Sequence, residues 1–518
     1  MNIPLSKPPK SKPIDHLAFC GSGGAPALVV RKDTISYEGL NLRIAALAGW
    51  LRGQGLQPGD RVATWLGKTD IACIMPLVAA RAGLVHVPVN PLLKAPQVRH
   101  IMADSGATLL IANRQRLGLL DDTMQDFQTV EDKALTAILE SDTEIGADWE
   151  TGSTQSPDAL AAILYTSGST GRPKGVMLSH ANLWLGAVSV ARYLGLWPED
   201  RTLCVLPLSF DYGQNQLLST WYAGGCCYPL DYLMPRDVLK AMVRHRITTL
   251  AAVPPLWLQL AELDWPAEAT DALRRMTNSG GALTEPLVRR LRQLAPQADL
   301  VAMYGLTEAF RSTWLDPALI DSHPTSIGHA IPFAEIMLVG DDGTIIAGQG
   351  EGELVHGGPL VAQGYWQDAE RTARRFRRAP EGAYFSGMAV WSGDTVRRDV
   401  QGLLYFVGRD DAMIKTSGNR VSPHEIEEAA IATGLVAEAV AFGVADAALG
   451  QAIILIARAS VTDETAIINA MKPLVPNYML PQRIALSDTL PRNANGKIDR
   501  VRLKAEFIAA ETDGEPAS

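Results

Sequence analysis

The stretch YTSGSTGRPKGV, residues 165–176, is the most informative part of the sequence. It follows an apolar, strand-like run at 159–165 and precedes a run with helical periodicity. Hydroxyl and glycine residues at such a junction let backbone N–H groups and side chains surround phosphate oxygens, and Lys174 adds positive charge. It is not a Walker A loop, because Gly175 stands where that loop needs Ser or Thr. The stretch predicts a phosphate-binding loop, with a flexible polar loop as the alternative.

Short apolar strands alternate with amphipathic helices around this loop. A helical pattern over 37–55, for example, is followed by the strand-like DRVATWL at 60–66. From about residue 333 the pattern becomes hairpin-like, with Asp-Asp-Gly as a turn, and after Gly408 a smaller unit begins. The alternation predicts an α/β fold of parallel sheets covered by helices, followed by a small α+β domain.

The composition is that of a globular protein with roughly two to four domains. The formal charge of −9 argues against a nucleic-acid partner. Five cysteines show neither a disulfide framework nor metal-ligand spacing, which indicates reduced surroundings. The N-terminus lacks the apolar centre of a signal peptide, and no run reaches the ~18 apolar residues of a membrane span. We therefore expect a soluble, cytoplasmic protein without membrane insertion.

The loop closely resembles the phosphate-binding signature of the adenylate-forming superfamily, which includes acyl-CoA synthetases, peptide-synthetase adenylation domains and firefly-type luciferases. The resemblance extends from about residue 20 to 505, and the later motifs come in the family's order. They are NSGGAL (278–283), MYGLTE (303–308), WSGDTVRRD (391–399), GRDDAMIKTSGNRVSPHEIE (408–427) and LPRNANGKIDR (490–500).

The resemblance implies a large N-terminal domain of parallel sheets covered by helices plus a small β-barrel-like part, joined to a small mobile α+β C-terminal domain. The expected units are a flexible segment (1–19), an AMP-binding domain (20–408), a hinge (409–411), an AMP-binding C-terminal domain (412–505) and a polar tail (506–518). The acidic stretch 121–158, with eleven acids and one base, is expected to be a solvated excursion with weak local structure.

Roles for individual residues follow from the same resemblance. Lys497 matches the mobile catalytic lysine, Thr307 a position near phosphate, and Glu308 a Mg²⁺ ligand that acts together with Thr166. The residues expected to bind ATP or AMP are Thr166, Ser167, Gly168, Ser169, Thr170, Gly171, Lys174, Gly280, Gly281, Tyr304, Asp394 and Arg409. Attack of a carboxylate on the α-phosphate brings anions together, so catalysis by neutralising and aligning charge is physically reasonable.

The implied reaction has two half-reactions. A carboxylic acid and ATP–Mg²⁺ give an acyl-adenylate and pyrophosphate, and a pantetheine thiol, of CoA or of an acyl or peptidyl carrier protein, then takes the acyl group. Asp411 is the expected hinge, and Gly418 is expected to line the thiol tunnel, with a plain turn as its alternative. An amino-acid-activating enzyme and a luciferase-like oxygenase are competing classes. A non-catalytic binder would be expected to lose Lys497, Glu308 or Asp394, and all three are present.

The stretch LSFDYGQNQLL (208–218) bears on the substrate. Many acyl-CoA synthetases are similar in having a histidine at the position of Asp211, whereas amino-acid adenylation domains have Phe-Asp, whose carboxylate pairs with the substrate ammonium. The alternative is that Asp211 caps the helix that follows, because Gln214 stands at capping-box spacing. Both interpretations remain open at this point.

Two further residues are candidates for the acid pocket. Trp257 would limit its depth, or would simply pack in the core. Arg311 would bind a second carboxylate or a polar group, or would form a surface ion pair; for both residues the simpler alternative is slightly favoured. Within the superfamily, LSFDYGQNQL, YGLTEAFRSTWLDP and AVWSGDTVRRD are most similar to acyl-CoA ligases associated with bacterial exosortase loci.

Overall fold

The computed structural model describes residues 7–120, 127–140, 149–166, 173–409, 414–416, 419–446, 449–493 and 496–512. Several predicted site residues lie outside these ranges: Ser167, Gly168, Ser169, Thr170, Gly171, Asp411 and Gly418.

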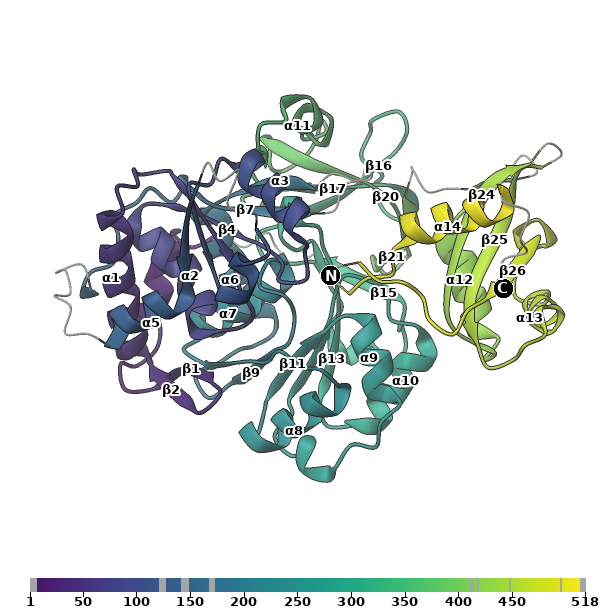
Figure 1. Cartoon of the computed structure of the whole chain (residues 1–518). Coiled ribbons are helices and arrows are strands. Elements are labelled where there is room, and N and C mark those ends of the chain that lie inside the picture. Colours follow the sequence, from purple (N-terminus) through teal and green to yellow (C-terminus); the bar gives the residue numbers. More distant parts are fainter. Residues whose placement is uncertain are drawn as a thin grey trace.

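A 14-stranded sheet runs through the large N-terminal part (Figure 1). One half is parallel apart from its edge strand β2 (Asp33–Ser36), and it contains β1 (Pro26–Val30), β10 (Cys226–Pro229), β9 (Arg201–Cys204), β11 (Thr249–Ala252), β12 (Arg275–Asn278) and β13 (Asp299–Tyr304). The other half is antiparallel and contains β14 (Thr313–Trp314), β15 (Ser326–Ala330), β21 (Leu404–Arg409), β20 (Met388–Arg398), β17 (Gly350–Gly357), β16 (Glu335–Val339) and β19 (Phe376–Arg378). The part expected to be barrel-like is this antiparallel half, which continues the large sheet.

A second, seven-stranded sheet carries the start of the phosphate-loop motif. Its parallel strands are β7 (Leu160–Thr166), β4 (Val85–Pro88), β3 (Arg61–Trp65), β5 (Leu109–Ala112) and β6 (Gln128–Glu131). On the side of β7 the sheet ends in two antiparallel strands, β8 (Lys174–Ser179) and β18 (Gly364–Tyr365).

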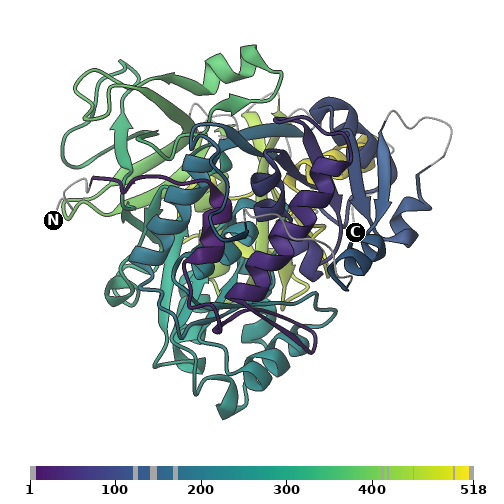
Figure 2. The same cartoon turned by 90° about the vertical axis from the view of Figure 1, so that its left-hand side faces the viewer.

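Helices separate and cover the two sheets. α6 (His180–Tyr193) lies against β7 and β8, α7 (Asp211–Tyr222) lies against β9 and β10, and the two helices pack on each other. The N-terminal helices form the purple face of Figure 2. The remaining helices of this part are α1 (Tyr37–Gly53), α2 (Asp70–Ala82), α3 (Ala95–Ser105), α4 (Arg114–Leu117), α5 (Asp132–Glu140), α8 (Pro235–His245), α9 (Pro254–Ala261), α10 (Glu285–Leu294) and α11 (Ala369–Arg375). The predicted α/β class is confirmed, with a core dominated by apolar helix faces between the sheets.

A small α+β unit follows, at the right of Figure 1. Its sheet orders β24 (Val436–Asp446), β25 (Gly450–Ala459) and β26 (Arg483–Leu486), after a short hairpin of β22 (Ile414–Thr416) and β23 (Asn419–Val421). Its helices are α12 (Pro423–Ala432), α13 (Glu464–Met471) and α14 (Arg500–Thr512). In the part of the chain that the structure describes, no helix combines the length and apolar character needed to cross a bilayer.

Three segments are more ordered than the sequence predicts. Within the expected flexible segment, a 3-10 helix (Ile14–Phe19) buries apolar side chains, and its Asp15 pairs with buried Arg81. Within the acidic stretch, β6 extends the second sheet and α5 buries Leu135. The expected tail is helical through 512, and Phe507 packs edge-on against Phe442 with ring centroids 5.8 Å apart.

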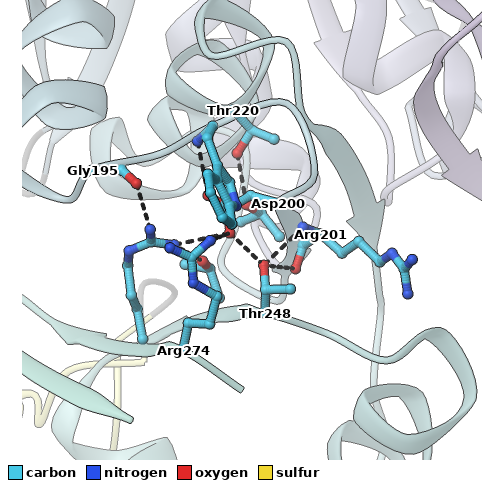
Figure 3. A network of polar contacts seen from close by, with 10 residues as sticks. Gly195, Asp200, Arg201, Thr220, Thr248 and Arg274 are labelled. Atoms are coloured by element: carbon cyan, nitrogen blue, oxygen red, sulfur yellow. Dashed lines mark hydrogen bonds and ion pairs between the residues drawn. The ribbon is translucent and has the colours of Figure 1, made fainter. Parts of the chain in front are cut away.

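A buried polar network fastens the amino ends of the central parallel strands (Figure 3). Asp200, just before β9, accepts hydrogen bonds from Thr248 Oγ1 at 2.7 Å and from Arg275 Nη1 at 2.9 Å. Thr248 precedes β11 and Arg275 begins β12, so one carboxylate ties three strands. The Trp197 N–H donates to its other oxygen at 2.9 Å. The network fixes the amino ends of these strands. Their carboxyl ends carry the predicted motifs.

Candidate active site

The predicted motifs meet at the carboxyl edge of the large sheet. The glycine turn 278–283 lies at the end of β12, the MYGLTE motif spans the end of β13 and the turn after it, and Asp211 begins α7 after β9. Since β9, β11, β12 and β13 are parallel neighbours, their carboxyl ends lie side by side. Crevices at this edge are where open α/β sheets bind ligands.

Lys174, Glu308 and Tyr365 form a compact cluster. Lys174 Nζ lies 2.8 Å from both Glu308 Oε1 and the Tyr365 hydroxyl, and that hydroxyl donates to Glu308 Oε1 at 2.6 Å. Sequence analysis missed Tyr365, because it joins the cluster through pairing of β18 with β8 and no local motif marks that contact. The cluster links the phosphate-loop strand to the MYGLTE motif.

Electrostatics keep this cluster charged. Burial would raise the pKa of Glu308, but Lys174, Arg375 and the hydrogen bonds from Lys174 and Tyr365 outweigh burial and lower that pKa to about 2. Burial lowers the pKa of Lys174, and Glu308 opposes that shift. At neutral pH Glu308 is therefore a carboxylate, and it lies beside the Lys174 amine.

Thr166 ends β7 directly opposite Lys174 on β8. Its buried Oγ1 has no hydrogen-bond partner within the described residues. A free hydroxyl and a carboxylate, Glu308, are oxygen ligands of the kind Mg²⁺ takes, and this ion usually completes its shell with phosphate and water oxygens. The residues present fit a magnesium ion bound together with a nucleotide.

Tyr304, Asp394 and Arg409 form a second cluster. The Tyr304 hydroxyl donates to Asp394 Oδ2, and Arg409 Nε lies 2.7 Å from Asp394 Oδ1. Asp394 and Arg409 are paired across β20 and β21, so the sheet register sets their contact. Burial and the neighbouring carboxylate raise the pKa of Tyr304, which keeps its hydroxyl protonated as a donor. A buried carboxylate beside a cation and an aromatic ring suits a ribose with its base.

Lys497 reaches the same region from the C-terminal unit. A Cβ placed on Gly280, whose φ is +83°, would lie 3.1 Å from Lys497 Cε and 3.5 Å from its Nζ. The adjoining turn is closed by Asn278, whose Nδ2 donates to the Gly281 carbonyl at 2.9 Å. Burial lowers the pKa of Lys497, while Asp211 opposes that shift. The catalytic lysine candidate and the glycine turn are thus brought together.

Asp211 is buried and does not cap a helix through its side chain. The N-cap of α7 is Phe210, no side-chain capping bond is present, and Gln214 Oε1 and Nε2 lack partners within the described residues. The capping alternative is therefore wrong. Asp211 Oδ2 instead accepts from Arg311 Nη1 at 2.8 Å, and Thr307 Oγ1 lies 3.5 Å from its other oxygen. The surface ion pair considered for Arg311 is also wrong, because its side chain is 2% exposed.

Trp257 lies in the core of the sheet–helix layer. Its side chain is fully buried, and Nε1 donates to the Thr277 carbonyl at 3.3 Å. The packing alternative describes this position, and contact with the acyl substrate stays a prediction.

Comparison with known proteins agrees with this geometry. A family model described as AMP-binding enzyme matches residues 19–366. The chain belongs to the AMP-binding enzyme family. The model of the AMP-binding enzyme C-terminal domain matches residues 425–497.

Relatives of this AMP-binding enzyme use different acids and acceptors. The chain is 31% identical to an L-proline–[L-prolyl-carrier protein] ligase of Pseudomonas fluorescens, over 92% of this chain and 95% of that protein. It is 30% identical to a feruloyl-CoA synthase of an Amycolatopsis species, over 91% and 94%. The crystal structure of ATP-bound MatB from Rhodopseudomonas palustris superposes with a TM-score of 0.86 at 26% identity, covering 96% of this chain and 99% of that one. The comparisons thus agree on adenylate-forming acid–thiol ligase chemistry and differ in substrate.

Proposed function

We propose that this AMP-binding enzyme is an ATP-dependent, AMP-forming acyl-CoA ligase. It converts a carboxylic acid and ATP to an acyl-adenylate and pyrophosphate, and then transfers the acyl group to a pantetheine thiol, that of CoA. The observation that carries the proposal is the convergence of Lys174 with Glu308, of Tyr304 with Asp394, and of Lys497 on one edge of the sheet.

In the first half-reaction the chain supplies positive charge and orientation. Lys174 and the loop residues Ser167, Gly168, Ser169, Thr170 and Gly171 hold phosphate oxygens, while Lys497 holds the attacking carboxylate beside the α-phosphate. Asp394 accepts from the ribose hydroxyls, Arg409 lies beside them, and Tyr304 packs by the base. Bound with ATP, Mg²⁺ held by Glu308 and Thr166 would neutralise the charge that develops on the pyrophosphate leaving group.

The second half-reaction needs room for a thiol. We place the hinge at Asp411, so that the unit from 412 to 505 turns relative to the domain 20–408 and removes Lys497 from the site. Gly418 would then lie along the pantetheine path. A lysine on a terminal loop suits such alternation, because it can serve one step and leave before the next.

A second candidate is an amino-acid-adenylating enzyme that loads a carrier protein. One observation favours it. Asp211 is buried at the site and does not cap a helix, which is the arrangement expected of a carboxylate that binds a substrate ammonium. Against it, Arg311 already balances the charge of Asp211. Relatives with both kinds of acceptor match at similar identity, so the acceptor has to be measured.

The test is mass spectrometry of the products formed by the full chain from ATP, Mg²⁺ and a pool of acids that includes amino acids, offered with CoA or with a holo-carrier protein. The acyl-CoA ligase predicts an acyl-CoA and AMP. An aminoacyl-carrier thioester without any acyl-CoA would instead establish the second candidate. An adenylate without thioester on either acceptor would contradict both.

Two finer assignments belong to the same proposal. The stretches LSFDYGQNQL, YGLTEAFRSTWLDP and AVWSGDTVRRD support a place among the acyl-CoA ligases of exosortase loci. We also propose that the enzyme works in the cytoplasm, where ATP, CoA and reduced thiols are available; all five of its cysteines are free.

A further inference from the structure

The backbone beside Glu308 is strained in a way that turns Arg311 inward. Phe310 has φ +66° and ψ −68°, and the Arg311 N–H donates to the Ala309 carbonyl at 2.8 Å. This is a γ-turn of the rare hand, and a bulky residue adopts it only when its surroundings enforce it. Burial of the Phe310 ring holds it in place, and Gly186 of α6 leaves room for it, because a Cβ there would lie 2.5 Å from the ring. Such outliers gather at functional sites.

Part of the Arg311 guanidinium has no hydrogen-bond acceptor within the described residues. Its Nη1 donates to Asp211 and to the Phe310 carbonyl, both at 2.8 Å. Its Nε and Nη2 are buried and have no partner within the described residues. Buried polar groups are nearly always hydrogen-bonded, because an unsatisfied donor loses its hydration without compensation. These two donor nitrogens can therefore take an acceptor that the described residues do not supply.

A small cavity borders Arg311 and can hold that acceptor; its walls are mostly apolar, and a few polar side chains reach it. Its volume is about 20 Å³, and Tyr212, Asn215, Gln216 and Thr277 are among its lining residues. Asn215 Nδ2 and Gln216 Oε1 likewise lack partners within the described residues. The volume is that of roughly one water-sized group. The space admits a single small group, and the unpartnered atoms of Arg311, Asn215 and Gln216 favour a polar one, because an alkyl or aryl tail would leave them unsatisfied.

The charge balance selects a neutral acceptor. Asp211 and Arg311 already form a buried pair without net charge, so a second carboxylate would bring an uncompensated anion into the pocket. A hydroxyl or carbonyl oxygen would satisfy the donors without that penalty.

We propose that Arg311 determines substrate specificity by binding, through Nε and Nη2, a neutral oxygen on the tail of a short carboxylic acid, with Asn215 and Gln216 completing the subsite. The inference rests on the proposed adenylating function. The substrate class is that of short acids with a hydroxyl or carbonyl substituent, with or without an amine.

Pairs of acids that exchange a hydroxyl for a methyl group test this most sharply. The pairs are 3-hydroxybutanoate with 3-methylbutanoate, and threonine with valine; kcat/KM is measured by acid-dependent ATP–pyrophosphate exchange with the full chain. In at least one pair the hydroxylated member should be favoured by about 100-fold or more, because a site built to bond a hydroxyl rejects an analogue that lacks it. Methyl members that exchange as well as or better than the hydroxylated ones overturn the inference while the proposed function stands.

Variants of Arg311 test whether this residue causes the preference for the hydroxylated acid. Arg311→Met should reduce the preference to less than about tenfold, since the remaining contacts resemble those of an apolar pocket. Arg311→Lys keeps a cation beside Asp211 but lacks the planar fork, so it should also lose most of the preference, and it decides the matter if Arg311→Met does not fold. Arg192→Met, an exposed change at the end of α6, is the matched control. A preference that both Arg311 variants retain overturns the inference.

No exchange with any acid of a panel from acetate to benzoate and the common amino acids overturns the proposed function, and this inference with it. That result is distinguishable from exchange with apolar acids alone, which overturns only the assignment to Arg311.

Discussion

At the scale of single residues, the site holds its charges in pairs. Glu308 faces Lys174, Asp211 faces Arg311, and Asp394 faces Arg409. Pairing lets a site bury ionised groups that would be very costly alone. Incoming phosphates and a carboxylate can then share cations that are already in place, which limits reorganisation during the reaction.

Glu308→Gln should lower adenylation by about 100- to 1,000-fold, because it removes a Mg²⁺ ligand and leaves Lys174 without its counter-charge. The Mg²⁺ concentration at which the adenylation rate saturates should also rise. Pyrophosphate exchange across a magnesium series measures both effects, and Glu285→Gln, exposed on α10, is the control. Unchanged exchange and magnesium dependence would remove Glu308 from the site.

The same carboxylate contributes to the pH dependence of stability. Its pKa falls from the ordinary 4.5 to about 2 on folding, so the stabilisation is present above pH 4.5 and is lost as the pH falls towards 2. Between these pH values the free energy of unfolding should fall less steeply in Glu308→Gln than in the wild type. Denaturant titrations at several pH values measure the difference. Parallel curves for the two proteins would contradict it.

The rate of adenylation should fall at alkaline pH as Lys497 loses its proton, which gives the reaction an alkaline limit. Burial lowers its pKa below the ordinary 10.5, so rising pH removes the required charge earlier than for an exposed lysine. Lys497→Arg should shift that limit to higher pH. Thioester formation from a preformed acyl-adenylate is the internal control and should lack the limit. An identical limit in both half-reactions would assign it to another group.

At the scale of elements, the sequence predicted those whose signal is local. The periodic helices and the order of motifs appear in the structure, because spacing and hydrophobic period act over neighbouring residues. The helix expected directly after the phosphate loop was wrong in one respect: the antiparallel strand β8 comes between the loop and α6. The Asp211–Arg311 pair was beyond such reasoning, since 100 positions separate its members and only the fold brings them together. α5 was missed because the many acids of the surrounding stretch 121–158 obscure the apolar residues of this short helix, which buries Leu135.

Gly280, in the turn after β12, leaves the space that the Lys497 side chain occupies, and a substitution there tests whether adenylation needs that space. Gly280→Ala should reduce adenylation by about tenfold or more, because the methyl group would lie 3.1 Å from Lys497 Cε. Gly343→Ala is a close control: its φ is +79° and nothing lies within 4 Å of the added Cβ, so it has the backbone strain without the contact. Equal loss in both variants would mean that strain alone explains the effect.

The network at Asp200 should serve stability and not chemistry. Asp200→Asn leaves Arg275 buried without its counter-charge and should destabilise the protein by about 3–5 kcal/mol, while the folded enzyme keeps its kcat/KM. Thermal unfolding and exchange kinetics below the transition separate the two effects. Asp341→Asn, in an exposed turn, is the control. Lost kcat/KM at full stability would indicate a catalytic role instead.

At the scale of the whole molecule, the site is assembled from parts that lie far apart in the chain. Lys174 comes from the second sheet, Asp211 and Glu308 follow the strands β9 and β13 of the large sheet, and Lys497 comes from the C-terminal unit. Movement of the C-terminal unit alone would remove Lys497 from the site. The arrangement therefore suits two successive reactions at one site.

Adenylation by this enzyme is tested by ATP–pyrophosphate exchange with the full chain over a broad panel of carboxylic acids. We expect exchange that requires an acid and Mg²⁺ and that falls by about 100-fold or more in Lys497→Ala, since that variant loses the charge that aligns the carboxylate. Absence of acid-dependent exchange across the panel, or exchange that Lys497→Ala leaves intact, would contradict it.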